Sequence, residues 1–355
     1  MNKIPNIPFT KLTEKQQLRK RELLSKPILQ IPLKGNTDLR NLIENYSNTS
    51  FQARKLGEAA KLYSERLNKE DTIIWSLSGS IFSAGLRQLT IDAINANLVD
   101  VLVCTGALFE QDMLEALGHK HYICNTEQND AELQDLYIDR VYDHLLDEMA
   151  LRQVDLTFKK ISSEMKPGNY SSRQFIEYCG KWLTQTNSSY ESVMQTAYER
   201  DIPVFIPALN DSSIGIGIAM SQNENNDSMT IDSIKDLREI AFMKEKAGDT
   251  GIIIVGGGVP KNYSQDAVVM AEMLGYDVDK HKFGIQISTA DVRDGGLSGS
   301  SLKEAISWGK NDKEMEEVMV WGEASVYFPI MINYVYHNKK KERKAKRLAK
   351  YFKSK

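Results

Sequence analysis

The sequence predicts an α/β fold: one doubly wound, mostly parallel, Rossmann-like sheet with helices on both faces. Short apolar runs, typical of strands that are covered on both sides, alternate along the chain with amphipathic helical segments. Most of these runs end in small or hydroxyl residues, as strand-to-helix turns do. The length of 355 residues allows one large α/β domain or two smaller ones, and the unbroken alternation favours one.

The first βαβ unit follows an N-terminal arm and a helix pair. The first forty residues are polar and lack sustained periodicity, so we expect an arm, and helical spacing from Asn41 to Leu67 predicts two helices. DTIIWSLSG (71–79) predicts a buried strand, SAGLRQLTIDAINANL (83–98) an amphipathic helix, and VDVLVCTGA (99–107) a second strand. Strands joined in this way by a helix are parallel.

The same alternation returns in the second half of the chain. Strands are predicted in IPVFIPAL (202–209), TGIIIVGGGVP (250–260), KFGIQISTA (282–290) and the first part of VMVWGEASVYFPIMINYVYH (318–337). Helices are predicted from Ser264 to Leu274, in SLKEAISWGK (301–310), and in the second part of 318–337, while 131–187 is expected to form helices and an insertion. We therefore predict an arm (1–40), a single α/β domain (41–337) and a basic C-terminal tail (338–355).

Composition excludes several classes of protein. Apolar residues make up 41% and charged residues 26% of the chain, unlike disordered, collagen-like or coiled-coil sequences. No window reaches the roughly 18 apolar residues of a membrane span. The N-terminus lacks the apolar core of a signal peptide, so we expect a cytoplasmic protein without membrane partners. Three cysteines without CxxC spacing predict neither a disulfide framework nor a metal site.

Charge is distributed unevenly. Residues 339–355 hold ten Lys/Arg and one Glu, a local charge of +9, so the net charge of −3 leaves −12 on the other residues. A basic tail can bind nucleic acid or anionic lipid. We favour a solvated helix end, because nothing else in the sequence predicts a basic groove for nucleic acid. The acidic remainder would suit a cationic substrate.

The turns after the predicted strands indicate a nucleotide site. Ligands of open parallel sheets bind beyond the carboxyl ends of the strands, where small residues let the backbone approach a phosphate closely. The spacing differs from GxGxxG, and three successive glycines alone also fit a simple tight turn. These turns contain Ser78-Gly79-Ser80, Thr105-Gly106-Ala107, Asn210 to Ser213, Gly256-Gly257-Gly258 and Thr289-Ala290-Asp291.

A candidate nucleophile follows the last of these turns. RDGGLSGSSLKEAISWGK (293–310) predicts a flexible loop, then a short helix that ends at Trp308, Gly309 and Lys310. A lysine beside a tryptophan can lose part of its hydration, which favours the neutral amine needed for imine chemistry. From its position alone, a lysine after Trp-Gly is more often a surface residue at a helix C-terminus.

Five motifs, in order from about residue 70 to 330, resemble the deoxyhypusine synthase family, which includes homospermidine synthase. The family's EAVSWGK signature around its catalytic lysine is matched by Glu304 to Lys310. The other matches are Ser83-Ala-Gly85-Leu-Arg87; Val99 to Val103 with Glu110-Gln111-Asp112; Pro207 to Gly215; and Gly256-Gly-Gly-Val-Pro-Lys261.

The resemblance implies the family's NAD-binding fold and a homotetramer with active sites at subunit interfaces. NAD would oxidise spermidine, and the aminobutyl group would pass through an imine on the catalytic lysine to an acceptor amine. That acceptor is a lysine of a translation initiation factor in deoxyhypusine synthase and putrescine in homospermidine synthase. The small-molecule amine substrate would thus be a polyamine or a relative of one.

The resemblance also assigns site residues. Lys310 would be catalytic, and Asp211, Glu304, Trp308, Glu323 and Asn262 would bind substrate. The NAD-binding residues would be Ser80, Ser83, Thr105, Gly106, Glu110, Asp211, Gly257, Gly258, Thr289, Ala290 and Asp294.

Several positions depart from the family pattern. Gln111, Ile216 and Leu297 stand where the family has acids, and Asn262 stands where it has a histidine. Losing negative charges weakens a site for a polycation, so we expect altered amine specificity. The alternatives are a catalytically inactive NAD-binding member and a true deoxyhypusine synthase that modifies an initiation-factor lysine.

Overall fold

The computed structural model describes residues 12–32, 38–186, 190–225 and 228–353 and centres on a six-stranded sheet. The strands are β1 (Thr72–Leu77), β2 (Val101–Cys104), β7 (Val204–Phe205), β9 (Thr250–Val255), β10 (His281–Ser288) and β11 (Asn311–Trp321). Their spatial order is β11-β10-β9-β1-β2-β7, and every neighbouring pair is parallel. In chain order this is 3-2-1-4-5-6, the arrangement of doubly wound dinucleotide-binding sheets. The predicted fold class is confirmed.

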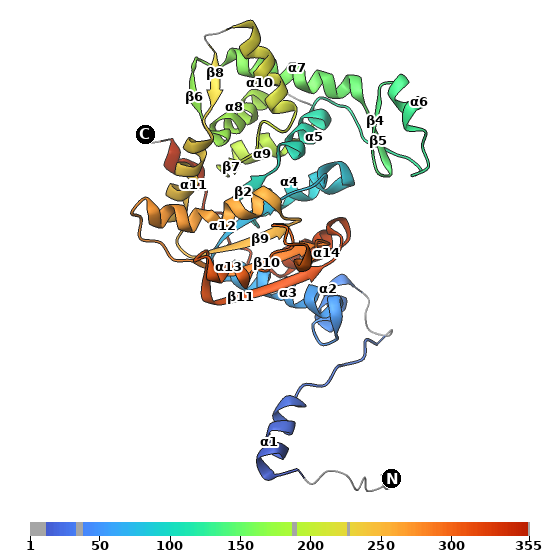
Figure 1. The fold of residues 1–355 in the computed structure, drawn as a ribbon, viewed down its shortest axis with the longest axis vertical. Coiled ribbons are helices and arrows are strands. Elements are labelled where there is room, and N and C mark those ends of the chain that lie inside the picture. Colours follow the sequence, from blue (N-terminus) through green and yellow to red (C-terminus); the bar gives the residue numbers. More distant parts are fainter. Residues whose placement is uncertain (1–11, 33–37, 187–189, 226–227, 354–355) are drawn as a thin grey trace.

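Alternate residues of β1 face two separate apolar layers. Ile73, Trp75 and Leu77 point into the larger layer, and Ile74 points into the smaller one. Helices α3 (Phe51–Asn68) and α14 (Ala324–Asn338) cover the first face, and α11 (Ser233–Ala247) and α12 (Gly258–Met273) cover the second, as Figure 1 shows. Burial on both faces explains why the central strands are continuous apolar runs.

The edge strand β11 begins earlier than the sequence predicts. Its first residues, NDKEMEE (311–317), are mostly charged, whereas the expected strand began at Val318. Burial alternates loosely along β11, with Met315 and Val318 inward and Glu314 and Glu316 exposed. Charged side chains on an edge strand also discourage pairing with other molecules.

The remaining elements of the body include the expected helix pair, α2 (Leu39–Tyr46) and α3. The helix predicted at 83–98 is a short π-helix, η1 (Phe82–Leu86), followed by α4 (Arg87–Asn95). Helix α5 (Gly106–Ala116) follows β2, α13 (Glu304–Ser307) precedes β11, and the 3-10 helix η2 is Val292–Asp294. In the described residues no helix is long and apolar enough to cross a membrane.

The insertion between β2 and β7 forms a second layer of structure beside the main sheet (Figure 1). It contains α6 (Asp130–Asp135), α7 (Glu148–Glu164), α8 (Ser172–Gln185), α9 (Val193–Glu199) and the antiparallel sheet β3-β5-β4 of Tyr122–Ile123, His144–Asp147 and Ile138–Val141. After β7 come α10 (Ser213–Glu224) and β8 (Met229–Ile231), which pairs in parallel with β6 (Gly168–Tyr170). The short strands here were not predicted.

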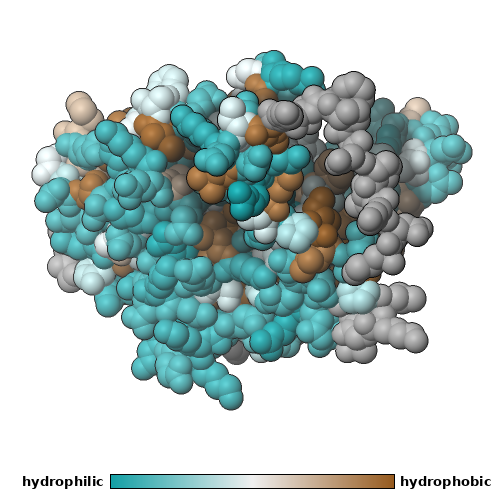
Figure 2. All heavy atoms as spheres, turned by 90° about the horizontal axis from the view of Figure 1, so that it is seen from below, coloured by the Kyte–Doolittle hydropathy of each residue, from teal (hydrophilic) through white to brown (hydrophobic). Residues whose placement is uncertain are grey.

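Helix α1 (Glu14–Leu23) of the N-terminal segment stands away from the body (Figure 1), whereas Leu29 N further along the segment donates a hydrogen bond to Asn48 O at 3.0 Å. The helix buries no residue and starts at a capping box formed by Thr13 and Gln16. Leu23, Leu24 and other apolar side chains of residues 12–32 are exposed. Figure 2, which views the molecule from this end, shows hydrophobic residues scattered among hydrophilic ones. Residues 1–11 lie outside the described structure.

The basic C-terminal segment packs on the body, which corrects the expectation of a solvated helix end. Arg343 is 4% exposed and forms an ion pair with Asp100, which is fully buried before β2. Further along, the short 3-10 helix η3 (Leu348–Phe352) buries Leu348 in the smaller apolar layer. The segment therefore crosses the amino ends of the strands, opposite the edge where ligands of such sheets bind.

Candidate active site

The carboxyl ends of the parallel strands meet in a cleft of ≈ 400 Å³. The cleft lies where the strand order reverses, between β1 and β9, and residues that follow β2, β7 and β10 also line it. Ligands of doubly wound sheets bind at this switch point. The structure brings together there six predicted site residues: Thr105, Asp211, Gly257, Gly258, Thr289 and Ala290.

The glycine turn after β9 is packed too tightly for a side chain. A Cβ on Gly257 would lie 2.5 Å from Ser298 Cα. Ser78 Oγ donates a hydrogen bond to Gly257 O at 2.6 Å, and Gly258 N donates to Ser298 Oγ at 3.0 Å. The turn is thus held between β1 and the loop of residues 295–300, with the first turn of α12 open to the cleft.

Thr105 supplies a hydroxyl that the protein leaves unpaired. Thr105 occupies the N-cap position of α5 and lines the cleft, but its side chain makes no capping hydrogen bond. Among the described residues its buried Oγ1 has no hydrogen-bond partner. Buried hydroxyl groups nearly always have a partner. A polar ligand in the cleft would satisfy this one.

Asp211 lines the cleft, and two further acidic residues, Glu110 and Asp155, lie close to one another behind its wall. Ser213 N donates a hydrogen bond to Glu110 Oε2 at 2.9 Å. Burial raises the pKa of the Glu110 carboxyl, and the nearby carboxylates of Asp155 and Asp211 act in the same direction. Burial also raises the pKa of Asp155. No motif marks Asp155, because α7 belongs to the insertion and only the fold brings it beside α5.

Lys310 closes a ring of three side chains with two residues of α12. Its Nζ donates to Asn262 Oδ1 at 2.6 Å and lies 2.9 Å from Asp266 Oδ1, while Asn262 Nδ2 donates to Asp266 Oδ2 at 2.6 Å. Gly309 has φ 73, a left-handed conformation that ends α13 and turns the chain back toward α12. Lys310 Nζ also lies 5.6 Å from the centre of the Trp308 ring. Lys310 is therefore partly buried and engaged, unlike a free surface lysine at a helix end.

Lys261 was not among the predicted site residues. It lies on α12 between the glycine turn that borders the cleft and Asn262, which bonds Lys310. It is fully buried, and its Nζ donates to Gln286 Oε1 at 3.0 Å, Leu297 O at 3.2 Å and both oxygens of Ser300. Burial lowers the pKa of its ammonium to about 8; the charge of Glu304 opposes this shift and that of Lys310 adds to it. Lys261 thus fastens the 295–300 loop over α12. Its place in the GGGVPK turn was the only signal in the sequence.

The residues predicted after β1 and β2 have different surroundings. Ser83 Oγ donates to Ser80 O at 2.8 Å and bonds His144 Nε2 at 3.0 Å. Gly106 packs against Ser212, whose Oγ would lie 2.3 Å from a Cβ at position 106. Of the cofactor residues assigned by resemblance, Ser80, Ser83, Gly106, Glu110 and Asp294 are not in the wall of the cleft.

Three acidic residues of the predicted site are exposed. Asp294 Oδ1 accepts a hydrogen bond from Gly296 N in the loop before α13, and Glu304 is the first residue of α13. Glu323 follows β11 and caps α14 through Ser325 N. Trp308 is 65% exposed. The Trp308 side of Lys310 is therefore open to solvent in the described structure.

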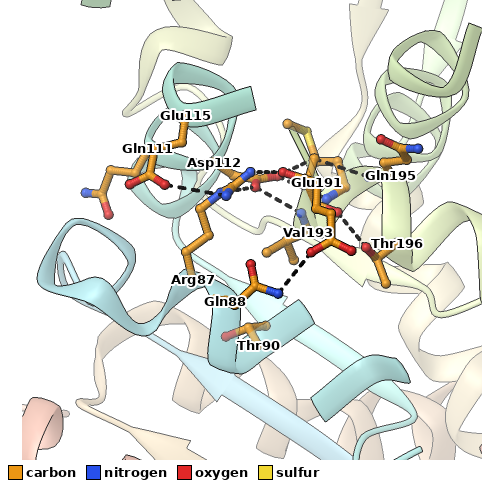
Figure 3. Close-up of polar contacts among 12 residues, drawn as sticks. Arg87, Gln88, Thr90, Gln111, Asp112, Glu115, Glu191, Val193, Gln195 and Thr196 are labelled. Atoms are coloured by element: carbon orange, nitrogen blue, oxygen red, sulfur yellow. Dashed lines mark hydrogen bonds and ion pairs between the residues drawn. The ribbon is translucent and has the colours of Figure 1, made fainter. Parts of the chain in front are cut away.

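Arg87 and Asp112, which belong to two of the motifs shared with the family, bond to each other, as Figure 3 shows. Neither residue lines the cleft. Arg87 Nε donates to Asp112 Oδ1 at 2.7 Å, and Asp112 also accepts bonds from Val193 N and Met194 N at the start of α9. Asp112 is fully buried. This pair holds α4, α5 and α9 together, so its role is structural.

Of the three positions where the chain lacks a family acid, two face solvent. Ile216 on α10 is 50% exposed and Leu297 is 40% exposed. Gln111 is buried, and its Oε1 accepts a hydrogen bond from Ser83 N at 3.0 Å. The neutral side chain at position 111 therefore fits an interior contact of the subunit.

Comparison with known proteins gives a consistent result. The protein-family model of deoxyhypusine synthase matches residues 41–335. A deoxyhypusine synthase-like protein of Chlorobaculum parvum is 43% identical over 338 residues, which cover 94% of this chain and 96% of that protein. One of Coxiella burnetii (strain RSA 493) is 44% identical over 340 residues, with the same coverage of 94% and 96%.

Archaeal and eukaryotic proteins are also similar. A Methanosarcina mazei protein named probable deoxyhypusine synthase 2 is 37% identical over 327 residues, covering 92% of this chain and 93% of that one. A crystal structure assigned as a deoxyhypusine synthase of Entamoeba histolytica superposes with a TM-score of 0.59 at 19% identity. The match covers 90% of this chain and 99% of the Entamoeba histolytica chain, and it supports the α/β fold described above.

Proposed function

The chain belongs to the deoxyhypusine synthase family, and we propose that it is an NAD-dependent transferase that moves an aminoalkyl group between amines. The donor would be a polyamine or a related amine, and the transferred group would be of the aminobutyl type. Lys310 would carry that group as an imine before an acceptor amine takes it. The observation that carries the proposal is the Lys310 amine, fixed on α12, the helix whose first turn borders the cleft at the switch point.

The cleft fits a dinucleotide. The tight turn at Gly257 and Gly258 lets a pyrophosphate approach the backbone closely, at the N-terminus of a helix. The unpaired Thr105 hydroxyl offers a hydrogen bond to a ligand, and Thr289 and Asp211 border the same space. A bound nicotinamide would accept a hydride from the amine carbon and return it later.

Lys310 would act as a covalent carrier. Its amine adds to the carbon of the oxidised donor, the bond from that carbon to the departing amine breaks, and the carbon remains double-bonded to Nζ. The acceptor amine then displaces Nζ from the same carbon. Trp308 offers a flat apolar surface and a cation–π contact beside the reacting nitrogen. Glu304 and Glu323 remain candidates for holding the cationic ends of the donor.

The amine specificity should differ from that for spermidine. Ile216 and Leu297 present apolar surface where the family pattern has acids. Each lost contact between a carboxylate and a cation in a partly buried site weakens binding by about 1 kcal/mol or more. We therefore propose a donor with fewer charges than spermidine, or a small-molecule acceptor, with a protein lysine as the less favoured acceptor.

The open side of the Lys310 region is consistent with an oligomer. Trp308 is 65% exposed although it lies beside the amine. Reactive imines need protection from water. We propose that a second subunit covers this side and that the full assembly is a homotetramer.

A trapping experiment tests the function. The protein is incubated with NAD and a panel of diamines and polyamines and reduced with borohydride, and its peptides are analysed by mass spectrometry. We expect an adduct on Lys310 whose mass identifies the transferred group. Lys310→Ala should form none while still binding NAD, and Lys303→Ala, an exposed lysine seven positions earlier, should behave like wild type.

The same experiment separates the alternatives. An adduct that forms with spermidine and transfers to a protein lysine would indicate a true deoxyhypusine synthase. Binding of NAD without an adduct from any amine would instead support the catalytically inactive reading and refute the transferase.

A further inference from the structure

Asp266 is the carboxylate closest to the proposed nucleophile. It is four residues after Asn262 on α12, so both side chains lie on one face of the helix. Asp266 Oδ1 lies 2.9 Å from Lys310 Nζ, and Asp266 Oδ2 accepts from Asn262 Nδ2 at 2.6 Å. Asn262 can bond both neighbours only when its oxygen faces Lys310 and its nitrogen faces Asp266. The ring therefore fixes the direction of every hydrogen bond in it.

Only one of the two partners of Lys310 can take a proton. The amide of Asn262 does not titrate, whereas the carboxylate of Asp266 does. Lys261 is not a partner of Lys310 in the described structure, because its Nζ is directed to Gln286, Leu297 and Ser300. Glu304, on α13, is exposed and forms no hydrogen bond or ion pair with Lys310 within the described residues.

We propose that Asp266 is the catalytic residue that moves protons between Lys310 and the amines that it exchanges. This inference rests on the function proposed above. The side chain of Asp266 is 35% exposed, against 13% for that of Lys310, so its carboxylate can reach both the buried amine and a bound substrate. General acid–base catalysis needs such a group within hydrogen-bond distance of the proton that it moves.

The proton balance of the exchange is complete with this one carboxylate. Lys310 begins as an ammonium with three protons and the donor as a protonated imine. Asp266 accepts a proton from Nζ, and the freed lone pair adds to the imine carbon. Asp266 gives that proton to the departing nitrogen and then takes a second proton from Nζ. The freed Nζ lone pair forms the new carbon–nitrogen double bond while the bond from carbon to the departing amine breaks and its electron pair stays on that amine. The released amine takes the second proton from Asp266 and leaves as an ammonium, and the third proton stays on the Lys310 imine.

The isosteric variant Asp266→Asn tests the role. It keeps the size of the side chain but cannot accept the proton. We expect formation of the Lys310 adduct, followed by rapid borohydride quenching with NAD and a reactive amine, to slow by about 100-fold or more. The amine concentration at half-saturation and the NAD affinity should stay within about threefold of wild type. Glu272→Gln, the same chemical change on the exposed end of α12, should leave the rate unchanged.

Chemical rescue separates proton transfer from positioning. Asp266→Ala leaves room for a small carboxylic acid, and added formate should accelerate adduct formation in proportion to its concentration. If Asp266→Asn forms the adduct slowly but formate does not accelerate adduct formation by Asp266→Ala, Asp266 only positions Lys310, and the proposal is overturned. An Asp266→Asn rate equal to wild type would overturn it while leaving the transferase intact. Absence of an adduct in the wild type would overturn both.

Discussion

Replacing Arg343 by methionine should lower the free energy of unfolding by about 3 kcal/mol. Arg343 and Asp100 form a buried ion pair, with side-chain exposures of 2% and 0%. Removing one partner of such a pair typically costs about 3–5 kcal/mol, because the other charge stays buried without compensation. Two backbone donors would remain on Asp100, Ile73 N at 2.8 Å and Lys346 N at 2.6 Å. We therefore expect the lower end of that range.

Urea denaturation followed by circular dichroism measures this loss. The midpoint should fall while the slope m stays constant, since the surface exposed on unfolding changes little. Lys344→Met is the matched control, because Lys344 lies in the same basic segment but is exposed; it should change stability by less than about 0.5 kcal/mol. The Arg343 effect should also persist at 1 M salt, because a buried pair is poorly screened.

A loss below about 1 kcal/mol for Arg343→Met, or a loss that disappears in high salt, would refute the reasoning. Such a result would mean that residues 339–353 are solvated in solution, as the charge pattern suggested. In that case residues 339–353 would not pack across the amino ends of the strands.

Two further predictions concern the cleft and acid stability. Gly257→Ala should weaken NAD binding at least tenfold by calorimetry, because its Cβ would lie 2.5 Å from Ser298 Cα; unchanged affinity would show that the turn is not part of the site. Burial lowers the pKa of His281 to about 3, below the value of about 6.5 in an unfolded chain. The unfolded state therefore binds the proton first, and stability present above pH 6.5 is lost as the pH falls from 6.5 toward 3. His281→Gln, which can still bond Thr250 and Ser264, should flatten this dependence in urea titrations between pH 7 and 4; a parallel decline in both proteins would contradict it.

The strands of the main sheet could be predicted because their signal is local. β1 and β9 carry apolar runs and are buried along their whole length, and β10 is buried at every position except Lys282. The charged start of β11 has no such signal, because its outer edge is free and its hydrogen bonds to β10 hold it as a strand. Helix α1 lacks an apolar face altogether, so only its capping box marks its start.

The position of the cleft could be predicted, since a parallel sheet places the turns after its strands along one edge, and six of the eleven assigned cofactor residues line it. The side chains that surround Lys310 could not be predicted from the sequence. Its partner Asn262 precedes it by 48 positions, and Asp266 carries no motif. Lys261 was visible in the glycine turn, but its four oxygen contacts depend on how the 295–300 loop folds back. The structure also separates Gln111, which is buried and accepts a hydrogen bond from Ser83 N, from Ile216 and Leu297, which face solvent.

By itself the sequence determined the fold class and the edge of the sheet where the cleft opens, and it singled out Lys310 as a candidate nucleophile, because periodicity, turn residues and a short motif are properties of neighbouring positions. Tertiary structure alone decided the 3-2-1-4-5-6 strand order, the pairing of Lys310 with Asp266, and the docking of the basic segment on Asp100. These features join residues far apart in the chain, and their energies come from burial and from hydrogen bonds made only after the layers pack.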